Sequence, residues 1–192
     1  TGTYYYQAQD GGPLRTGVYK CDAKGKVTSI STEPGQNSAI FSGNFKQLML
    51  THHSAATPPT YTLRNDKGKV LKTLQDNAAL KQKIDGMNLA KIEFFQFQTQ
   101  DGVDLNGIMV KPADFDANKK YPVILYQYSG PGSQQVLDSW YAGNCSAALL
   151  ERYMAQEGFV SVIVDGRGTG GRGAEFEKQT YLKLGQLESH DQ

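Results

Sequence analysis

The chain has 192 residues, of which 39% are hydrophobic, and 20 Lys and Arg stand against 19 Asp and Glu to give a formal net charge of +1. That length suffices to bury a core in one or two domains. A protein that binds nucleic acid or an anionic membrane carries a basic excess, so we expect neither partner. No run of about 18 apolar residues occurs, which predicts no transmembrane helix. Cys21 and Cys145 are too few for a disulfide framework or a zinc site, and we interpret them as free, small hydrophobic residues.

The first hundred residues have the pattern of short strands separated by turns. Apolar and aromatic residues recur with strand spacing, and almost no segment has the spacing of a helix. We predict strands at residues 3–9, 16–22, 26–31, 38–43, 45–54, 59–66 and 69–74. Residues 75–97 are predicted to be a connector, with a short helix over residues 76–85.

This half contains a repeat. The segments "YKCDAKGKVTSI" and "YTLRNDKGKVLKTL" share an aromatic strand, a polar turn centred on Lys-Gly and a Lys-Val pair that opens the next strand. Gly25 and Gly68 supply the residue that such a hairpin turn needs at positive φ. They lie 43 positions apart. One four-stranded propeller blade takes about 40 to 45 residues, so the repeat indicates the blades of a β-propeller.

From residue 101 the pattern changes to alternating strands and helices. We predict a strand ending at Pro112, a buried strand over residues 121–130, and a second buried strand over residues 159–168. A helix between the last two is expected to have Asn144 as its N-cap and Gly158 just past its end. This βαβ order predicts a parallel pair of strands. Residues 182–192 are expected to run from a loop into another helix.

The carboxyl ends of two parallel strands are where an open sheet of this kind places its ligands. Here these ends are residues 128–132 and 165–168. Gly166, Gly168 and Gly171 have the G-x-G-x-x-G spacing of a dinucleotide-binding turn. No apolar helical pattern follows at once, however, and the expected acidic residue about twenty positions on is missing. We therefore favour a glycine-rich surface loop that Asp165 and Arg167 hold by hydrogen bonds, and expect no cofactor.

Metal and nucleophile motifs are incomplete. His52 and His53 are neighbours on a predicted strand, so their side chains point to opposite faces and cannot share a metal, and His190 stands alone. We expect no metal site. The sequence contains no G-x-S-x-G, and Ser133 lacks the strand, turn and helix of a nucleophile elbow. A complete Ser-Asp-His triad is therefore not expected within the chain.

Three segments carry a family resemblance. The segments "KKYPVILYQYSGPGSQ" and "LLERYMAQEGFVSVIVDGRGTGGRGAEFEKQTYLKLGQLESHDQ" resemble the opening of the catalytic domain in the dipeptidyl peptidase IV branch of the prolyl oligopeptidase family, and "YTLRNDKGKVLKTLQDN" resembles its last propeller blade. In that branch a strand runs into Tyr-x-Gly-Pro and a second ends in Asp-Gly-Arg-Gly. The resemblance implies a mixed β and α/β fold. Residues 1–100 would form the last propeller blades and a connector, and residues 101–192 an incomplete α/β-hydrolase domain.

The resemblance assigns one catalytic role. In the family, the tyrosine of the Tyr-x-Gly-Pro turn donates its hydroxyl to the oxyanion of the acyl-transfer intermediate, and the matching residue is Tyr128. The residues that match Asp-Gly-Arg-Gly are interpreted as scaffold. The triad is expected to lie beyond Gln192, and the residues that bind the substrate's amino end before Thr1, so the chain alone is expected to be inactive.

The implied activity is that of a serine exopeptidase releasing N-terminal dipeptides, preferably after proline, from peptides with a free N-terminus. A prolyl tripeptidyl peptidase and an acylaminoacyl peptidase share this part of the pattern and stay open as alternatives. So does a non-catalytic β-rich binding module. The family also suggests a periplasmic or extracellular location, and a homo-oligomer is possible.

Overall fold

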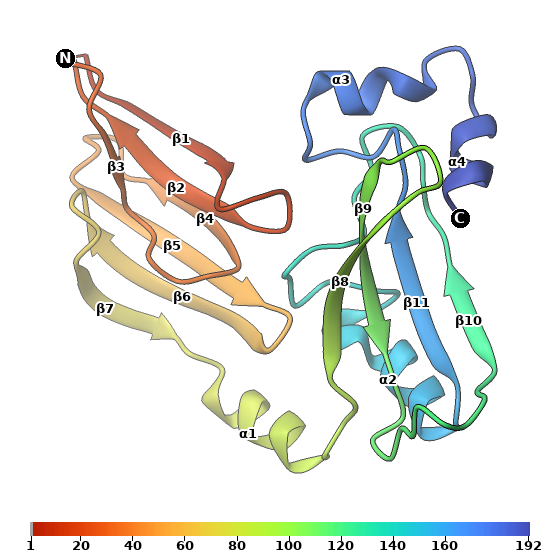
Figure 1. Ribbon diagram of the computed structural model, residues 1–192. Coiled ribbons are helices and arrows are strands. Elements are labelled where there is room, and N and C mark those ends of the chain that lie inside the picture. The colour runs from red at the N-terminus through yellow and green to blue at the C-terminus, as the bar shows by residue number, and fades with distance from the viewer. Residues whose placement is uncertain (1) are drawn as a thin grey trace. The chain divides into compact units, whose positions relative to one another are not determined.

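A computed structural model describes residues 2–192, which form two compact units (Figure 1). The first unit contains the residues up to Gly86 together with Asp138–Trp140, and the second contains Met87–Leu137 and Tyr141–Gln192. In the described part of the chain, no helix is both long enough and apolar enough to span a bilayer.

The first unit consists of two antiparallel sheets. A three-stranded sheet has the order β1-β2-β3 and a four-stranded sheet the order β4-β5-β6-β7. The strands are β1 (Tyr4–Gln9), β2 (Thr16–Cys21), β3 (Val27–Ser29), β4 (Gln36–Phe41), β5 (Gln47–Ser54), β6 (Thr57–Asn65) and β7 (Val70–Gln75). All seven strands predicted in this region are confirmed. Buried side chains from both sheets form one core, namely Val18, Ile30, Leu48 and Leu50. A four-stranded antiparallel sheet packed on a three-stranded one is consistent with part of a propeller.

The sequence repeat corresponds to two equivalent hairpin turns. In the β2–β3 turn the side chain of Asp22 accepts hydrogen bonds from the amides of Lys24 and Lys26 at 2.9 and 3.0 Å. In the β6–β7 turn Asn65 accepts the same two bonds, both at 3.0 Å, from residues 67 and 69. Gly25 has φ 81° and Gly68 has φ 84°. The repeat in the sequence therefore corresponds to two turns of the same kind. In each turn an acceptor side chain binds two backbone amides, and a glycine takes the positive φ that the turn requires.

The two turns give a matched test of backbone strain. An alanine at either glycine must adopt positive φ, which costs roughly 1–2 kcal/mol. At Gly25 an added Cβ meets nothing within 4 Å, whereas at Gly68 it would lie 2.7 Å from the carbonyl oxygen of Ile30. We expect Gly68→Ala to lower the urea midpoint of unfolding clearly more than Gly25→Ala. Equal losses for the two variants would show that the contact with Ile30 relaxes freely.

A half-buried ion pair in the first unit, between Arg64 and Glu33, predicts a pH dependence. Arg64 is 4% exposed, and its guanidinium donates to the carboxylate of Glu33 at 2.6 Å. Burial alone would raise the pKa of Glu33, but the bonds from Arg64 and the Thr32 amide outweigh it and lower the pKa from 4.5 to about 2. The ionised carboxylate therefore stabilises the fold above pH 4.5, and this contribution is lost as the pH falls toward 2.

The corresponding test compares the chain with its Glu33→Gln variant. At pH 6 we expect the variant to unfold at lower urea concentration, because Arg64 loses its anionic partner. The difference between the two proteins should shrink as the pH is lowered through the range in which Glu33 becomes protonated. A difference that stays constant down to pH 2 would exclude the ionised form of Glu33 as its cause.

The segment Asp138–Trp140 belongs to the first unit. The carboxylate of Asp138 accepts hydrogen bonds from Arg15 at 2.9 Å and from the amide of Ala55 at 3.1 Å. The amide of Trp140 donates to Nδ1 of His53 at 3.2 Å. Desolvation lowers the pKa of His53, which favours the neutral ring that this acceptor role needs.

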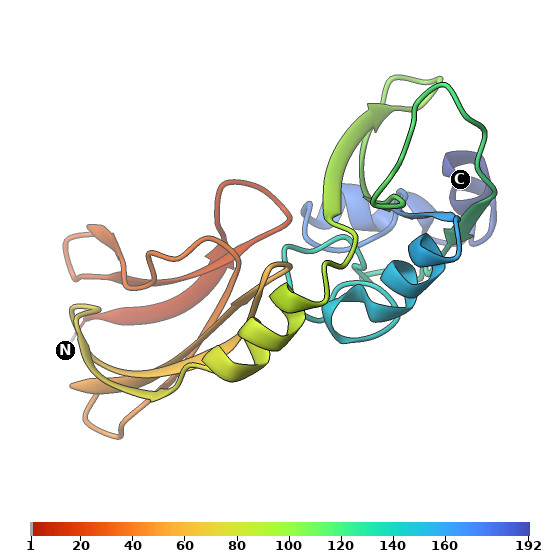
Figure 2. The ribbon, with the colours of Figure 1, turned by 90° about the horizontal axis from the view of Figure 1, so that it is seen from below.

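The second unit is built on one mixed sheet with the order β10-β11-β9-β8. The strands are β8 (Ile92–Gln98), β9 (Asp104–Val110), β10 (Val123–Tyr126) and β11 (Val160–Asp165). β10 and β11 are parallel, as predicted, and the other two neighbouring pairs are antiparallel. The helix α2 packs against β11 and β9 (Figure 2). The α-helices of the described residues are α1 (Ala78–Gly86), α2 (Leu149–Gln156), α3 (Ala174–Glu177) and α4 (Gln186–Asp191), and the short 3₁₀ helices are η1 (Ser146–Ala148) and η2 (Lys178–Thr180).

Three sequence-based expectations need correction. The division between the units falls after Gly86 rather than after residue 100, because the expected connector contains β8, which pairs with β9. Asn144 is not an N-cap: the residues at 147 and 148 have positive φ and break the predicted helix, so that α2 begins only at Leu149. Gly158 does lie just past the end of α2, with φ 86°.

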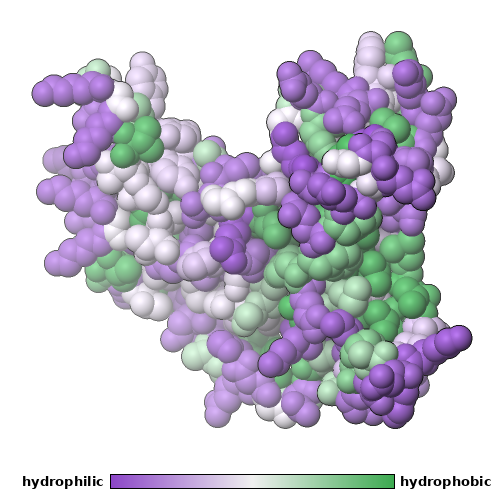
Figure 3. Space-filling model, in the orientation of Figure 1, coloured by the Kyte–Doolittle hydropathy of each residue, from purple (hydrophilic) through white to green (hydrophobic). Residues whose placement is uncertain are grey.

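The third correction concerns β10. It has four residues and lies at the edge of the sheet rather than in its interior. Val123 and Leu125 are 62% and 46% exposed, although their strand was expected to be buried. Figure 3 shows hydrophobic surface over this part of the second unit. A strand's burial depends on what packs on its two faces, and in the described residues only one face of β10 is covered, so an apolar sequence alone does not bury it.

Candidate active site

The carboxyl ends of β10 and β11 bring two loops together. We call residues 127–133 the Tyr128 turn and residues 165–171 the glycine loop. The amide of Gly132 donates to the carbonyl of Gly168 at 3.0 Å, and the amide of Gly170 donates to the carbonyl of Ser133 at 2.8 Å. The sequence-based expectation that these two strand ends meet is confirmed. Parallel strands end at the same edge of a sheet, and this is why residues nearly forty positions apart become neighbours.

Tyr128 lies just beyond the end of β10 and is 58% exposed. Ser133 closes the turn behind it. The Ser133 hydroxyl donates to the carbonyl oxygens of Tyr128 and Gly130, with Oγ at 3.1 and 2.6 Å from them. The hydroxyl of Ser133 therefore fixes the backbone of Tyr128, while the ring of Tyr128 stays accessible to solvent. Ser133 is engaged by two carbonyls and has no arrangement of an activated nucleophile.

An apolar hollow adjoins the Tyr128 turn. It has a volume of about 620 Å³ and shares Pro131 with the turn. Its other lining residues come from α3, η2 and the loop after them, and they are Glu177, Lys178, Thr180, Tyr181, Leu182 and Leu184. A hollow of this volume and apolar character can hold part of a small ligand.

Asp165, the last residue of β11, joins the two loops through its side chain. It is 6% exposed, and its carboxylate accepts hydrogen bonds from the amide of Gln135 at 2.9 Å and from that of Val136 at 2.8 Å. Burial raises the pKa of Asp165, and the two amide bonds oppose that shift only in part. The prediction that Asp165 takes part in holding the glycine loop by hydrogen bonds is confirmed, but the expectation of a surface loop is wrong, because residues 165–170 are buried.

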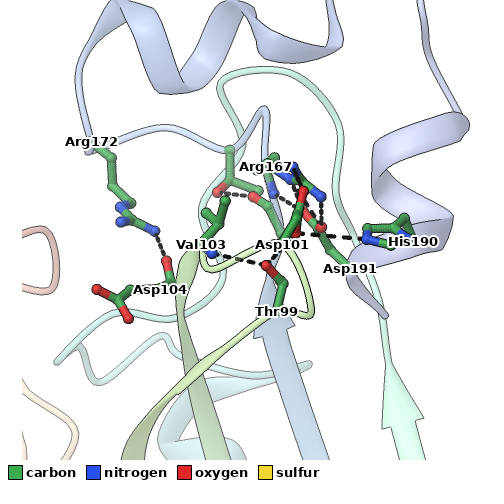
Figure 4. A network of polar contacts seen from close by, with 10 residues as sticks. Thr99, Asp101, Val103, Asp104, Arg167, Arg172, His190 and Asp191 are labelled. Atoms are coloured by element: carbon green, nitrogen blue, oxygen red, sulfur yellow. Dashed lines mark hydrogen bonds and ion pairs between the residues drawn. The ribbon is translucent and has the colours of Figure 1, made fainter.

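Arg167 anchors the other side of the glycine loop (Figure 4). It is 5% exposed, and its guanidinium donates to Asp191 from Nε at 3.0 Å and from Nη2 at 2.6 Å, while Nη1 donates to Asp101 at 2.6 Å. The Arg167 amide also donates to Asp191 at 2.6 Å. The hydrogen bonds that Arg167 donates to Asp191 are the main reason that the pKa of Arg167 is raised. Hydrogen bonds from Thr99 first, and then from Arg167, lower the pKa of Asp101 to about 2.

The partner of Arg167 was missed in the sequence. Asp191 belongs to α4, and its side chain is fully buried in the ion pair. Once the structure shows Arg167 to be buried, a carboxylate is required to neutralise it, but the sequence pattern predicts a surface loop at this position. The sequence did not indicate which of the 19 acidic residues this would be.

The glycines of the loop serve close packing rather than a phosphate. The first helix after Gly171 is α3, which has four residues, so the long helix that opens a dinucleotide site does not follow the glycines here. An added Cβ at Gly168 would lie 2.5 Å from Oγ1 of Thr180, and one at Gly171 would lie 2.5 Å from Oε1 of Gln134. The G-x-G-x-x-G spacing thus reflects contacts within the protein.

The histidines take separate positions. His52 lies 3.0 Å from the carbonyl oxygen of Pro34 and His53 accepts from Trp140, so the two rings face different surroundings, as expected for neighbours on a strand. His190 is 3.7 Å from Asp101. Among residues 2–192, no group of three or more His, Cys, Asp or Glu side chains comes together as a metal site would require.

Comparisons with known proteins identify the kind of protein. A family model described as the prolyl oligopeptidase family matches residues 147–192, and one described as the dipeptidyl peptidase IV N-terminal region matches residues 1–59. A probable dipeptidyl peptidase 4 from Aspergillus flavus is 34% identical over 158 residues, which cover 81% of this chain and 20% of the relative. The chain belongs to the prolyl oligopeptidase family, and within it to the dipeptidyl peptidase IV type.

Solved structures give the same result. The crystal structure of Porphyromonas gingivalis dipeptidyl peptidase 4 matches with a TM-score of 0.92 and 45% identity, covering 98% of this chain and 26% of that one. A putative dipeptidyl aminopeptidase IV from Bacteroides ovatus matches with a TM-score of 0.82 and 30% identity, again over 98% of this chain and 26% of the other. The chain spans about a fifth of the length of the curated relatives it matches.

Proposed function

We propose that the whole protein is a serine exopeptidase that releases N-terminal dipeptides, preferably after proline, by acyl transfer. The observation that carries this proposal is the Tyr128 turn: a tyrosine held at the tip of a parallel strand, in a chain 45% identical to Porphyromonas gingivalis dipeptidyl peptidase 4. In this proposal the first unit is the end of a β-propeller and the second is the first part of an α/β-hydrolase domain. The parallel pair β10–β11 with α2 packed on the sheet supports the second assignment.

Tyr128 is proposed to supply an oxyanion donor. In acyl transfer the carbonyl oxygen of the scissile bond gains negative charge, and a hydroxyl already fixed near that oxygen stabilises it without reorganisation. One such donor is worth about 3 kcal/mol of transition-state stabilisation. The exposed ring of Tyr128 and the bracing of its backbone by Ser133 suit this role. The serine, histidine and aspartate of the reaction are proposed to come from outside the 192 residues.

Three features of the proposal go with the family. The substrate is a peptide with a free N-terminus, no cofactor takes part, and the location is periplasmic or extracellular. In the 192-residue chain by itself, the outer edges of the edge strands of the described sheets would favour association, whereas for the whole protein a homo-oligomer stays open. Tripeptidyl and acylaminoacyl release are the nearest alternatives, and the names of the relatives favour dipeptidyl release.

A substrate series tests the proposed activity. The full-length protein is expected to release p-nitroaniline from Gly-Pro-p-nitroanilide. It should not cleave the same compound with an acetylated amino end, because a free N-terminus is part of what is recognised. A fluorophosphonate, which labels activated serines, should abolish the release. Cleavage of the acetylated compound at an equal rate would exclude the exopeptidase, and preferred release of a tripeptide would favour the tripeptidyl alternative.

The 192-residue chain by itself is expected to release no p-nitroaniline from the same substrate. Without a nucleophile and a base, an oxyanion donor worth about 3 kcal/mol leaves the hydrolysis of an anilide too slow for the assay to detect. Purified chain assayed beside a mock purification provides the measurement. Activity that exceeds the mock preparation and is blocked by the fluorophosphonate would place a nucleophile within these residues.

A further inference from the structure

The glycine loop and the Tyr128 turn are coupled through a short path of hydrogen bonds. Asp165 holds the amides of Gln135 and Val136, which lie two and three residues after the end of the turn. Two residues before Gln135, the Ser133 carbonyl accepts from Gly170. The Ser133 hydroxyl then reaches back to the carbonyl of Tyr128. The position of the tyrosine backbone thus depends on groups in β11 and the loop after it.

The contact between the two loops is tight. Gly170 has no space for a side chain, because an added Cβ would lie 2.7 Å from the backbone oxygen of Gly132. Asp165 is almost fully buried, so its two bonds to the backbone are shielded from water and are stronger than exposed ones. A carboxylate also accepts both amide protons at once, whereas an amide side chain in its place would offer one acceptor and direct N–H groups at the other donor.

We propose that Asp165 is a positioning residue for the reaction: it fixes the Tyr128 turn so that the tyrosine hydroxyl points to where the oxyanion forms. Asp165 touches neither substrate nor the reacting atoms in this arrangement and acts through Tyr128. The inference rests on the proposed function of Tyr128. A displacement of about 1 Å in a catalytic group lowers the rate by up to about a hundredfold, so a loosened turn has a measurable effect.

A double-mutant cycle in the full-length protein tests this inference. Asp165→Asn, Tyr128→Phe and the double variant are assayed on Gly-Pro-p-nitroanilide. We expect Asp165→Asn to lower kcat by about tenfold or more with KM changed by less than about threefold. In the Tyr128→Phe background the same substitution should change kcat by less than about threefold, since the hydroxyl that it positions is already absent.

Two further variants keep the test decisive. If Asp165→Asn fails to fold, Ser133→Ala replaces it in the cycle, since it removes only the hydroxyl that closes the turn, and Ser133→Thr should restore kcat. Asp101→Asn is the matched control. Asp101 binds Arg167 on the outer side of the same loop and is exposed, so kcat should stay unchanged.

The outcomes separate this inference from the proposed function. If Tyr128→Phe lowers kcat but Asp165→Asn or Ser133→Ala lowers it by the same factor in both backgrounds, the positioning role is wrong and the function of Tyr128 stands. If Asp165→Asn leaves kcat unchanged in the wild-type background, the positioning role is likewise wrong. If Tyr128→Phe itself has no effect on kcat, the proposed function fails and the positioning role fails with it.

Discussion

Tyr128→Phe in the full-length protein is expected to lower kcat by roughly a hundredfold or more while KM changes little. The substitution removes one oxygen and keeps the aromatic ring, so the packing of the Tyr128 turn should be preserved. The lost hydrogen bond is stronger in the transition state than in the ground state, and such a loss falls on kcat. Steady-state kinetics on Gly-Pro-p-nitroanilide, with the melting temperature measured alongside, provide the result.

The matched control is Tyr126→Phe. Tyr126 is the last residue of β10, two positions before Tyr128, and lines a small apolar cavity of about 130 Å³ beneath α2. Its hydroxyl is remote from the proposed oxyanion, so kcat should be nearly unchanged. Equal losses in the two variants would contradict the oxyanion role. So would a Tyr128→Phe variant whose loss of activity follows its loss of thermal stability.

Asp191→Asn is expected to destabilise the second unit by about 3–5 kcal/mol, because it leaves the buried guanidinium of Arg167 without its anionic partner. The side chain of Asp191 is fully buried, so water cannot replace the lost charge. The loss should appear as faster amide hydrogen exchange in β11 and β9. Exchange reports local stability even where two units do not unfold in a single step.

Asp101→Asn is again the control for this prediction. Asp101 binds the same guanidinium at the same distance of 2.6 Å, but its side chain is 47% exposed. An exposed ion pair stabilises little, because water can solvate the guanidinium when the charge of Asp101 is removed. Amide exchange in β11 should therefore change little. Similar increases in amide exchange for the two variants would contradict the prediction. They would show that the burial of Asp191 does not make its ion pair with Arg167 more stabilising than that of Asp101.

Local sequence was sufficient for most of the first unit. Strand alternation placed all seven strands, and the repeat around Gly25 and Gly68 placed two turns that the structure shows to be equivalent. These features are predictable because the interacting groups of a turn lie within a few residues of one another. The helix expected over residues 76–85 was also found, as α1.

Other elements had no sufficient local signal. Alanine is the best helix former, yet Ala147 and Ala148 adopt positive φ and delay the start of α2. The buried carboxylate of Glu151 accepts two hydrogen bonds from Asn144 at this point, from the amide and from the side chain, at 3.0 and 2.7 Å. These contacts of the folded chain outweigh a propensity of less than about 1 kcal/mol per residue.

By itself the sequence determined the kind of elements, their order, the meeting of two strand ends and, through its motifs, the family and Tyr128 as the candidate catalytic residue. Only the tertiary structure decided that β8 joins the second sheet, that β10 lies at an edge, and which acid neutralises Arg167. Arg167 and Asp191 are 24 residues apart, and Asp165 and Gln135 are 30 apart. Pattern and propensity act over a few residues, whereas pairing and burial depend on which distant segments the fold brings into contact.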